Sequence, residues 1–107
     1  MIFWQQIFLY NTNITLVGKG SFMPEITRFF GILITMYFRE HMPPHFHAWY
    51  SGHRAEFDFE GNILAGEMPS KQTKMIAAWA VMYADELALA WEDCRNGNNP
   101  QKIRPLM

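Results

Sequence analysis

Three of the four histidines in this chain lie within seven residues, in the run His41-Met42-Pro43-Pro44-His45-Phe46-His47. Proline fixes its own φ angle and favours extended backbone in the residue before it, so this run cannot lie inside a helix. The residues after the prolines alternate as in a β-strand, which points His45 and His47 to the same face. Two imidazoles on one face, with His41 across a rigid turn, can transfer protons, ligate a metal ion or contact a phosphate.

The first interpretation of this histidine run is acid–base chemistry on a phosphodiester such as RNA. An unperturbed imidazole has a pKa of about 6.5, so a histidine pair can supply a base and an acid near neutral pH. We therefore predict that His45 and His47 transfer protons, with His41 in support. Arg54, on the polar face of the next strand, can stabilise charge on a phosphate. Two tyrosines can also donate a proton: Tyr37 and Tyr50.

Two alternatives for the same run stay open. A His-x-His pair on a strand suits zinc, and the site would then be His41, His45 and His47, or would include an acid such as Glu40. The spacing matches no established zinc motif, and the sequence otherwise implies no cofactor. In the other alternative the block is structural: its imidazoles bond backbone carbonyls, Phe46 packs into the core, and the chain works as a non-enzymatic binding module.

Composition excludes several classes of protein. The 107 residues, half of them apolar, form one globular domain with a single core. The formal net charge of −1 gives no bulk attraction to nucleic acid or to an anionic membrane, so RNA contact needs a local basic patch. The single cysteine, Cys94, fits a reducing cytoplasm. Eight methionines and 16% aromatic residues favour an interface with a partner.

The first 22 residues stand apart from the rest. This stretch is too short and too polar to span a bilayer, and it lacks the basic region and cleavage site of a signal peptide. Lys19-Gly20-Ser21 can be encoded by a purine-rich ribosome-binding sequence. We therefore predict that Met23 is the natural start, residues 1–22 an extension and 23–107 the single domain. The alternative is a strand Ile2–Leu9 at the edge of the sheet.

The middle of the chain has the alternation of β-strands. Both faces of residues 27–39 are apolar, which predicts a central buried strand in which Gly31 marks a bulge or a close approach of another backbone segment. Ser51-Gly52 and Gly61-Asn62 are turn signals between the later strands. The predicted strands are residues 27–39, 45–50, 53–60 and 63–67.

One long helix follows the strands. Ser70 is its predicted N-cap, and Asn96-Gly97 closes it. The fold class is therefore α+β: a small antiparallel sheet of three to four strands with one long C-terminal helix packed on one face. The apolar stripe of this helix runs at steps of three and four residues through Ile76, Trp79, Ala80, Tyr83, Leu87, Ala90, Trp91 and Cys94.

The charges along this helix run against its dipole. Lys71 and Lys74 lie in the first turn, whereas four acids lie in the second half: Asp85, Glu86, Glu92 and Asp93. Lysines at a helix start oppose the partial positive charge there, and acids toward the end oppose the negative one. We interpret these charges as a solvated face. The alternative is an anion site at the helix start.

Taken together, Met23 to Leu106 resemble a bacterial family known as domain of unknown function 4160. The motifs that carry the resemblance are Met23-Pro24-Glu25-Ile26, Met36-Tyr37-Phe38, the His41–His47 block, Pro69, Trp79, Glu86-Leu87, Trp91, Gly97 and Pro105-Leu106. The resemblance implies a gene pair like a toxin–antitoxin module, with a small cognate partner protein encoded nearby. We predict a toxin-like component of such a pair that acts on RNA through the histidine cluster; the alternative is a non-enzymatic, antitoxin-like regulatory or protein-binding module. The oligomeric state stays open.

Overall fold

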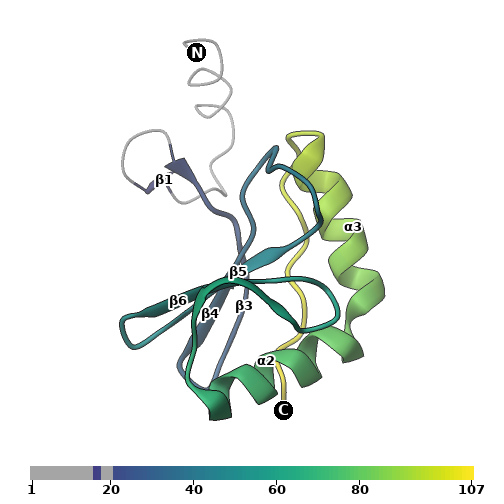
Figure 1. Ribbon diagram of the computed structural model, residues 1–107. Coiled ribbons are helices and arrows are strands. Elements are labelled where there is room, and N and C mark those ends of the chain that lie inside the picture. Colours follow the sequence, from purple (N-terminus) through teal and green to yellow (C-terminus); the bar gives the residue numbers. More distant parts are fainter. Residues whose placement is uncertain (1–15, 18–20) are drawn as a thin grey trace.

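The computed structural model, which describes residues 16–17 and 21–107, has a five-stranded antiparallel sheet and two helices (Figure 1). The predicted α+β class is confirmed. The strands of the sheet pair in sequence order, so each neighbour is joined by a short connection. Residues 1–15, and with them the expected strand Ile2–Leu9, lie outside the described residues. The strands are β3 (Glu25–Phe29), β4 (Ile32–Thr35), β5 (Phe46–Tyr50), β6 (His53–Phe57) and β7 (Ile63–Glu67), with β1 (Leu16–Val17) and β2 (Ser21–Phe22) as a separate pair.

The segment predicted as one central strand, residues 27–39, is a hairpin, which raises the strand count to five. Phe30 and Gly31 both have positive φ, 47° and 78°, and Phe29 pairs with Ile32. A two-residue loop with two positive φ values matches the twist of antiparallel strands. The Phe30 side chain is 61% exposed. The prediction of a bulge at Gly31 was wrong because phenylalanine rarely occupies this turn position.

The remaining turns agree with the sequence. Ser51 and Gly52 have φ values of 45° and 83° and join β5 to β6. Along these two strands His47 pairs with Glu56 and Trp49 with Arg54, so all four side chains share one sheet face. The opposite face carries Phe46, Ala48, Ala55 and Phe57, which are buried in the core.

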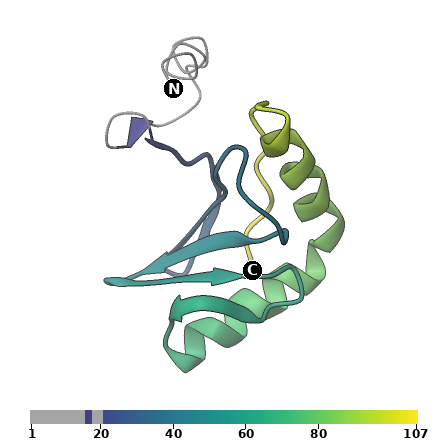
Figure 2. The same ribbon diagram turned by 45° about the horizontal axis from the view of Figure 1, so that its top comes forward.

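The predicted single helix is two helices, α2 (Ser70–Met82) and α3 (Ala84–Arg95), which meet at Tyr83. Tyr83 has φ −118° and ψ 33°, outside the helical range. Ser70 is the first residue of α2 and makes no side-chain cap, so the N-cap prediction was also wrong. Figures 1 and 2 show α2 below the sheet and α3 turning up along its side. Among the described residues no helix is long and apolar enough to cross a membrane.

The break has a geometric reason. A straight helix over residues 70–95 would be about 39 Å long, whereas a five-residue strand spans about 17 Å. The bend lets α2 cover the sheet, while α3 packs against the chain segments that lie beside the sheet (Figure 2). The predicted apolar stripe is confirmed on both sides of the break, because its members are buried except for the half-buried Tyr83.

Cys94 lies at the end of this stripe and is 1% exposed. Burial, with a smaller contribution from the charge of Asp93, raises the pKa of its thiol to about 12. Because the thiolate is the reactive form, we expect Cys94 to react with a disulfide reagent at pH 8 far more slowly than free cysteine does. Colorimetric thiol titration checks this: one thiol should appear in denaturant and none promptly in the native protein. Prompt native labelling would contradict it.

Candidate functional site

The carboxylate of Glu40 lies at the centre of the histidine run. Its Oε2 atom is 3.0 Å from Nε2 of His47 and 3.3 Å from Nε2 of His45. The His45 ring lies between the other two, with centroid distances of 5.2 Å to His41 and 5.3 Å to His47. A second carboxylate, Oε1 of Glu56, is 3.9 Å from Nε2 of His45. The structure therefore brings the three predicted histidines together around two acids.

The loop between β4 and β5 positions these groups. The backbone N–H of Arg39 donates to the carbonyl of Cys94 at 3.0 Å, which ties the loop to the end of α3. The ring of His45 packs on that of Trp91 in α3, with centroids 5.5 Å apart. The Met42–Pro43 peptide bond is cis. Both ends of the loop are thus held by the core.

Two of the imidazoles bond the loop backbone through Nδ1. His45 Nδ1 donates to the carbonyl of Pro43 at 2.7 Å, and His41 Nδ1 donates to the carbonyl of Met42 at 3.0 Å. Since a carbonyl can only accept, both Nδ1 atoms carry protons. His45 is 1% exposed, whereas His41 is exposed to solvent. The Met42 hydrogen bond and then the charge of Glu40 raise the pKa of His41.

The third imidazole, His47, has the opposite arrangement. Its Nε2 donates to Glu40, so the neutral ring has its lone pair on Nδ1. No hydrogen bond joins Nδ1 of His47 to another described residue, and His47 is only 6% exposed. Burial lowers the pKa of His47 and outweighs the bond to Glu40, which raises it. In the neutral ring, Nδ1 of His47 is thus left with a free lone pair.

Tyr37 and Arg54 extend the site along the same sheet face. The Tyr37 ring lies 4.5 Å from that of His47, centroid to centroid. Burial raises the pKa of the Tyr37 phenol, and the charge of Arg54 partly offsets this. The Arg54 guanidinium lies over the Trp49 ring, 5.3 Å from its centroid.

The candidate metal ligands differ from the three predicted histidines. One atom from each of Glu40, His41 and His45 lies within 4.8 Å of the others, and these residues are the group that can hold a metal ion among the described residues. His47 is outside this group, although it bonds to the same carboxylate. Sequence reasoning named Glu40 as a possible ligand but missed its place at the centre. It did not include Glu56 in the site and so missed its approach to His45.

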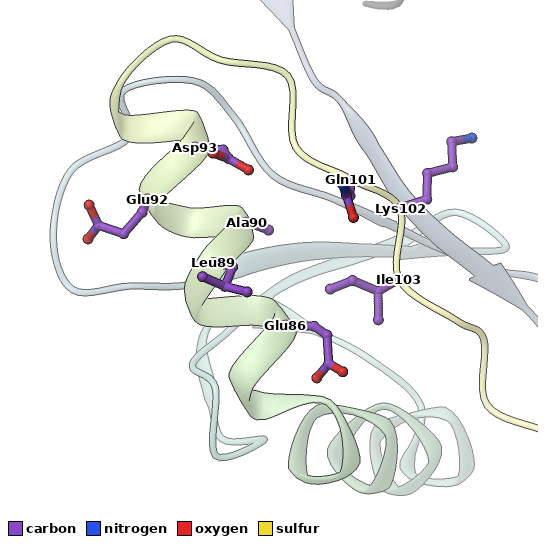
Figure 3. Close-up of a pocket in the computed structure, with 8 residues that line it drawn as sticks. All are labelled: Glu86, Leu89, Ala90, Glu92, Asp93, Gln101, Lys102 and Ile103. Atoms are coloured by element: carbon purple, nitrogen blue, oxygen red, sulfur yellow. The ribbon is translucent and has the colours of Figure 1, made fainter.

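A pocket lies away from the histidine cluster. Figure 3 shows a pocket of about 300 Å³ between α3 and the C-terminal segment, with Glu86 and Asp93 pointing from the helix toward the segment. Leu89 and Ala90 supply apolar surface on the helix side and Ile103 on the segment side. The pocket is acidic and amphipathic, and no residue of the histidine cluster lines it.

Fold and site together define a small α+β protein with a partly buried histidine–carboxylate cluster. The chain matches the model of the family Domain of unknown function (DUF4160) over residues 31–92, more than half of its length, and it therefore belongs to that family. The resemblance seen in the sequence is thus confirmed, and the matched range contains the whole cluster. Searches of curated proteins and of solved structures found no match.

Proposed function

We propose that this chain is a cytoplasmic, toxin-like member of a two-protein module and that it cleaves RNA at the cluster around Glu40. The observation that carries the proposal is the pairing of Glu40 with His47. A carboxylate that accepts from one ring nitrogen fixes the tautomer and leaves the other nitrogen as a base. Here that other nitrogen, Nδ1, makes no hydrogen bond with another described residue.

The neighbouring groups supply the other parts that the reaction needs. His47 Nδ1 takes the proton of a ribose 2′-hydroxyl, whose oxygen attacks the adjacent phosphorus. The bond from phosphorus to the 5′-oxygen breaks, and the Tyr37 hydroxyl protonates the departing oxygen to leave a 2′,3′-cyclic phosphate. Arg54 stabilises the extra charge on the phosphate. In this scheme His47 is the base and Tyr37 the acid, whereas His45, also predicted to transfer protons, has Nδ1 bonded to the Pro43 carbonyl and Nε2 beside Glu40.

A second candidate function is a non-enzymatic binding module with a structural histidine block. It is supported by the Nδ1 bonds of His41 and His45 to backbone carbonyls, which rigidify the loop. Several large apolar side chains on the helices are also exposed, as in a surface that contacts a cognate partner: Val81, Met82 and Leu89.

The test compares His47→Asn with His53→Asn. His53 is an exposed histidine at the start of β6 and lies outside the cluster, so it provides a matched control. Purified full-length proteins are incubated with total RNA, and the 3′ ends of the products are analysed. We expect His47→Asn to lower the cleavage rate by about 10²–10⁴-fold, the usual contribution of a general base. His53→Asn should cleave like the original chain, with 2′,3′-cyclic phosphate ends.

Growth of cells that express each variant separates the two candidate functions. Growth arrest that is lost with His47→Asn, while the variant keeps its melting temperature, supports cleavage. Arrest that survives His47→Asn but is lost with Leu89→Ser on α3 supports the binding module instead. The absence of both RNA cleavage and growth arrest for the unmodified chain rules out the toxin-like proposal.

A further inference from the structure

The proposed acid–base chemistry leaves Nε2 of His41 and Nε2 of His45 without a role. Both rings carry their proton on Nδ1, where it is donated to a backbone carbonyl. In the neutral rings Nε2 therefore has a bare lone pair. Histidines that ligate metals typically donate the other ring N–H to a carbonyl or carboxylate, which orients the ring. The loop carbonyls of Met42 and Pro43 provide this support to two successive histidines.

The surroundings of His45 favour a cation. Its Nε2 lies 3.3 Å from Glu40 Oε2, within hydrogen-bond distance, and 3.9 Å from Glu56 Oε1. One imidazole nitrogen and two carboxylate oxygens thus meet where the His45 side chain is 1% exposed. Such an arrangement is costly unless positive charge lies among these atoms. Two Lewis-basic nitrogens and a carboxylate suit a transition-metal ion better than calcium or magnesium, which prefer oxygen ligands.

We propose that Glu40, His41 and His45 bind one divalent transition-metal ion of the zinc class. Two histidines and one glutamate form a ligand set of known catalytic zinc sites, which leave a further position open. Metal bonds of about 2.0–2.1 Å at tetrahedral angles place ligand atoms about 3.4 Å apart. His45 Nε2 and Glu40 Oε2 are already 3.3 Å apart. The third ligand atom lies within 4.8 Å of these two, and the exposed His41 ring can close that gap by rotation.

His47 serves this site from outside the ligand set. It donates Nε2–H to Glu40 at 3.0 Å and so holds the carboxylate in place. Groups of this kind typically change metal affinity by about 10–100-fold when they are removed. The structure therefore predicts a graded series in which a ligand matters most, His47 less and the remote His53 not at all.

The test uses the full chain after treatment with a chelator, titrated with zinc chloride in a calorimeter and with cobalt chloride in a visible spectrometer. We expect one equivalent of zinc to bind and cobalt to give the absorption bands of a four-coordinate site. His41→Asn, at an exposed position where folding is unaffected, should weaken zinc binding by more than about 100-fold, His47→Asn by about 10–100-fold. His53→Asn should bind zinc like the unmodified chain.

Two results would overturn the metal site: no zinc uptake by the unmodified chain, or equal affinity in His41→Asn and His53→Asn. Neither measurement uses RNA, so the metal site and the proposed cleavage fail independently. Zinc binding with no loss of RNA cleavage in His47→Asn would support the metal and refute the acid–base proposal. RNA cleavage that persists in chelator, with no zinc uptake, would do the reverse.

Discussion

Trp79→Ala is expected to destabilise the protein by about 3–5 kcal/mol, the range measured for truncation of large buried aromatic side chains. Trp79 is fully buried. Its ring lies 5.5 Å from that of Phe46 in β5 and 5.7 Å from that of Phe29 in β3, centroid to centroid. Its Nε1 donates to the carbonyl of Arg104 at 2.8 Å. One side chain thus joins α2 to two strands and to the C-terminal segment, and its loss removes packing in all three directions.

Urea denaturation followed by circular dichroism measures this effect. Val81→Ala on the same helix is the matched control, because Val81 is 65% exposed and its truncation should change the free energy of unfolding by about 0.5 kcal/mol or less. Trp79→Phe keeps most of the ring and loses the bond to Arg104, so its cost should be smaller than that of Trp79→Ala. Equal midpoints for Trp79→Ala and Val81→Ala would contradict this account of the core.

The strands show where a sequence pattern is informative and where it is ambiguous. Alternation identified β5 and β6, because one face of this hairpin is buried and Ser51-Gly52 is a typical turn pair. All residues of β7 are exposed, and this strand was predicted from the Gly61-Asn62 turn signal before it. The turn Phe30-Gly31 has the same backbone geometry as Ser51-Gly52, but its first residue is a large apolar one. A side chain of that kind is typical of a strand, so two short strands had the pattern of one long strand.

The order of charges along the helices marks a helix start, although from the sequence we interpreted these charges as a solvated face. Asp85 and Glu86 oppose the dipole of a single helix, but they lie in the first turn of α3, where the dipole favours acids. Arg95 lies in the last turn of α3, where it is favourable, whereas Glu92 and Asp93 in that turn still oppose the dipole. The apolar spacing continues across Tyr83 and hides the break. The order of charges therefore marked the start of a new helix, while periodicity alone could not.

The sequence predicted the histidines of the candidate site but not the central position of Glu40. The His-x-His spacing places His45 and His47 on neighbouring parts of one face, as a strand requires. Glu40 precedes two prolines, and its return to the histidines depends on the path of the loop and on the bond from Arg39 to Cys94 in α3. That contact joins residues far apart in the sequence, so no local pattern carries it. Arg54 is also on the predicted face. The strand register places it opposite Trp49, and its guanidinium lies over the Trp49 ring.

Glu40 and His47 should behave as one unit in a double-mutant cycle. Glu40→Gln keeps an amide oxygen that can accept from His47 but removes the charge that stabilises the ring when it gains a proton. We expect Glu40→Gln to lower the rate of RNA cleavage by about tenfold or more, which is part of the 10²–10⁴-fold attributed to His47. The double variant should be no slower than His47→Asn alone, because residues that act together give non-additive losses.

The same four proteins test the pair in the folded state. Glu40 is 18% exposed and His47 is buried, so their contact should contribute a coupling of about 0.5–3 kcal/mol to the free energy of unfolding. Glu92→Gln on the exposed surface of α3, combined with His47→Asn, serves as the uncoupled control. Additive losses of both stability and cleavage would mean that Glu40 neither holds nor charges the ring of His47. If the losses of stability were coupled but the losses of cleavage rate were additive, Glu40 would only stabilise the loop. A residue that positions the base must affect the rate through that base.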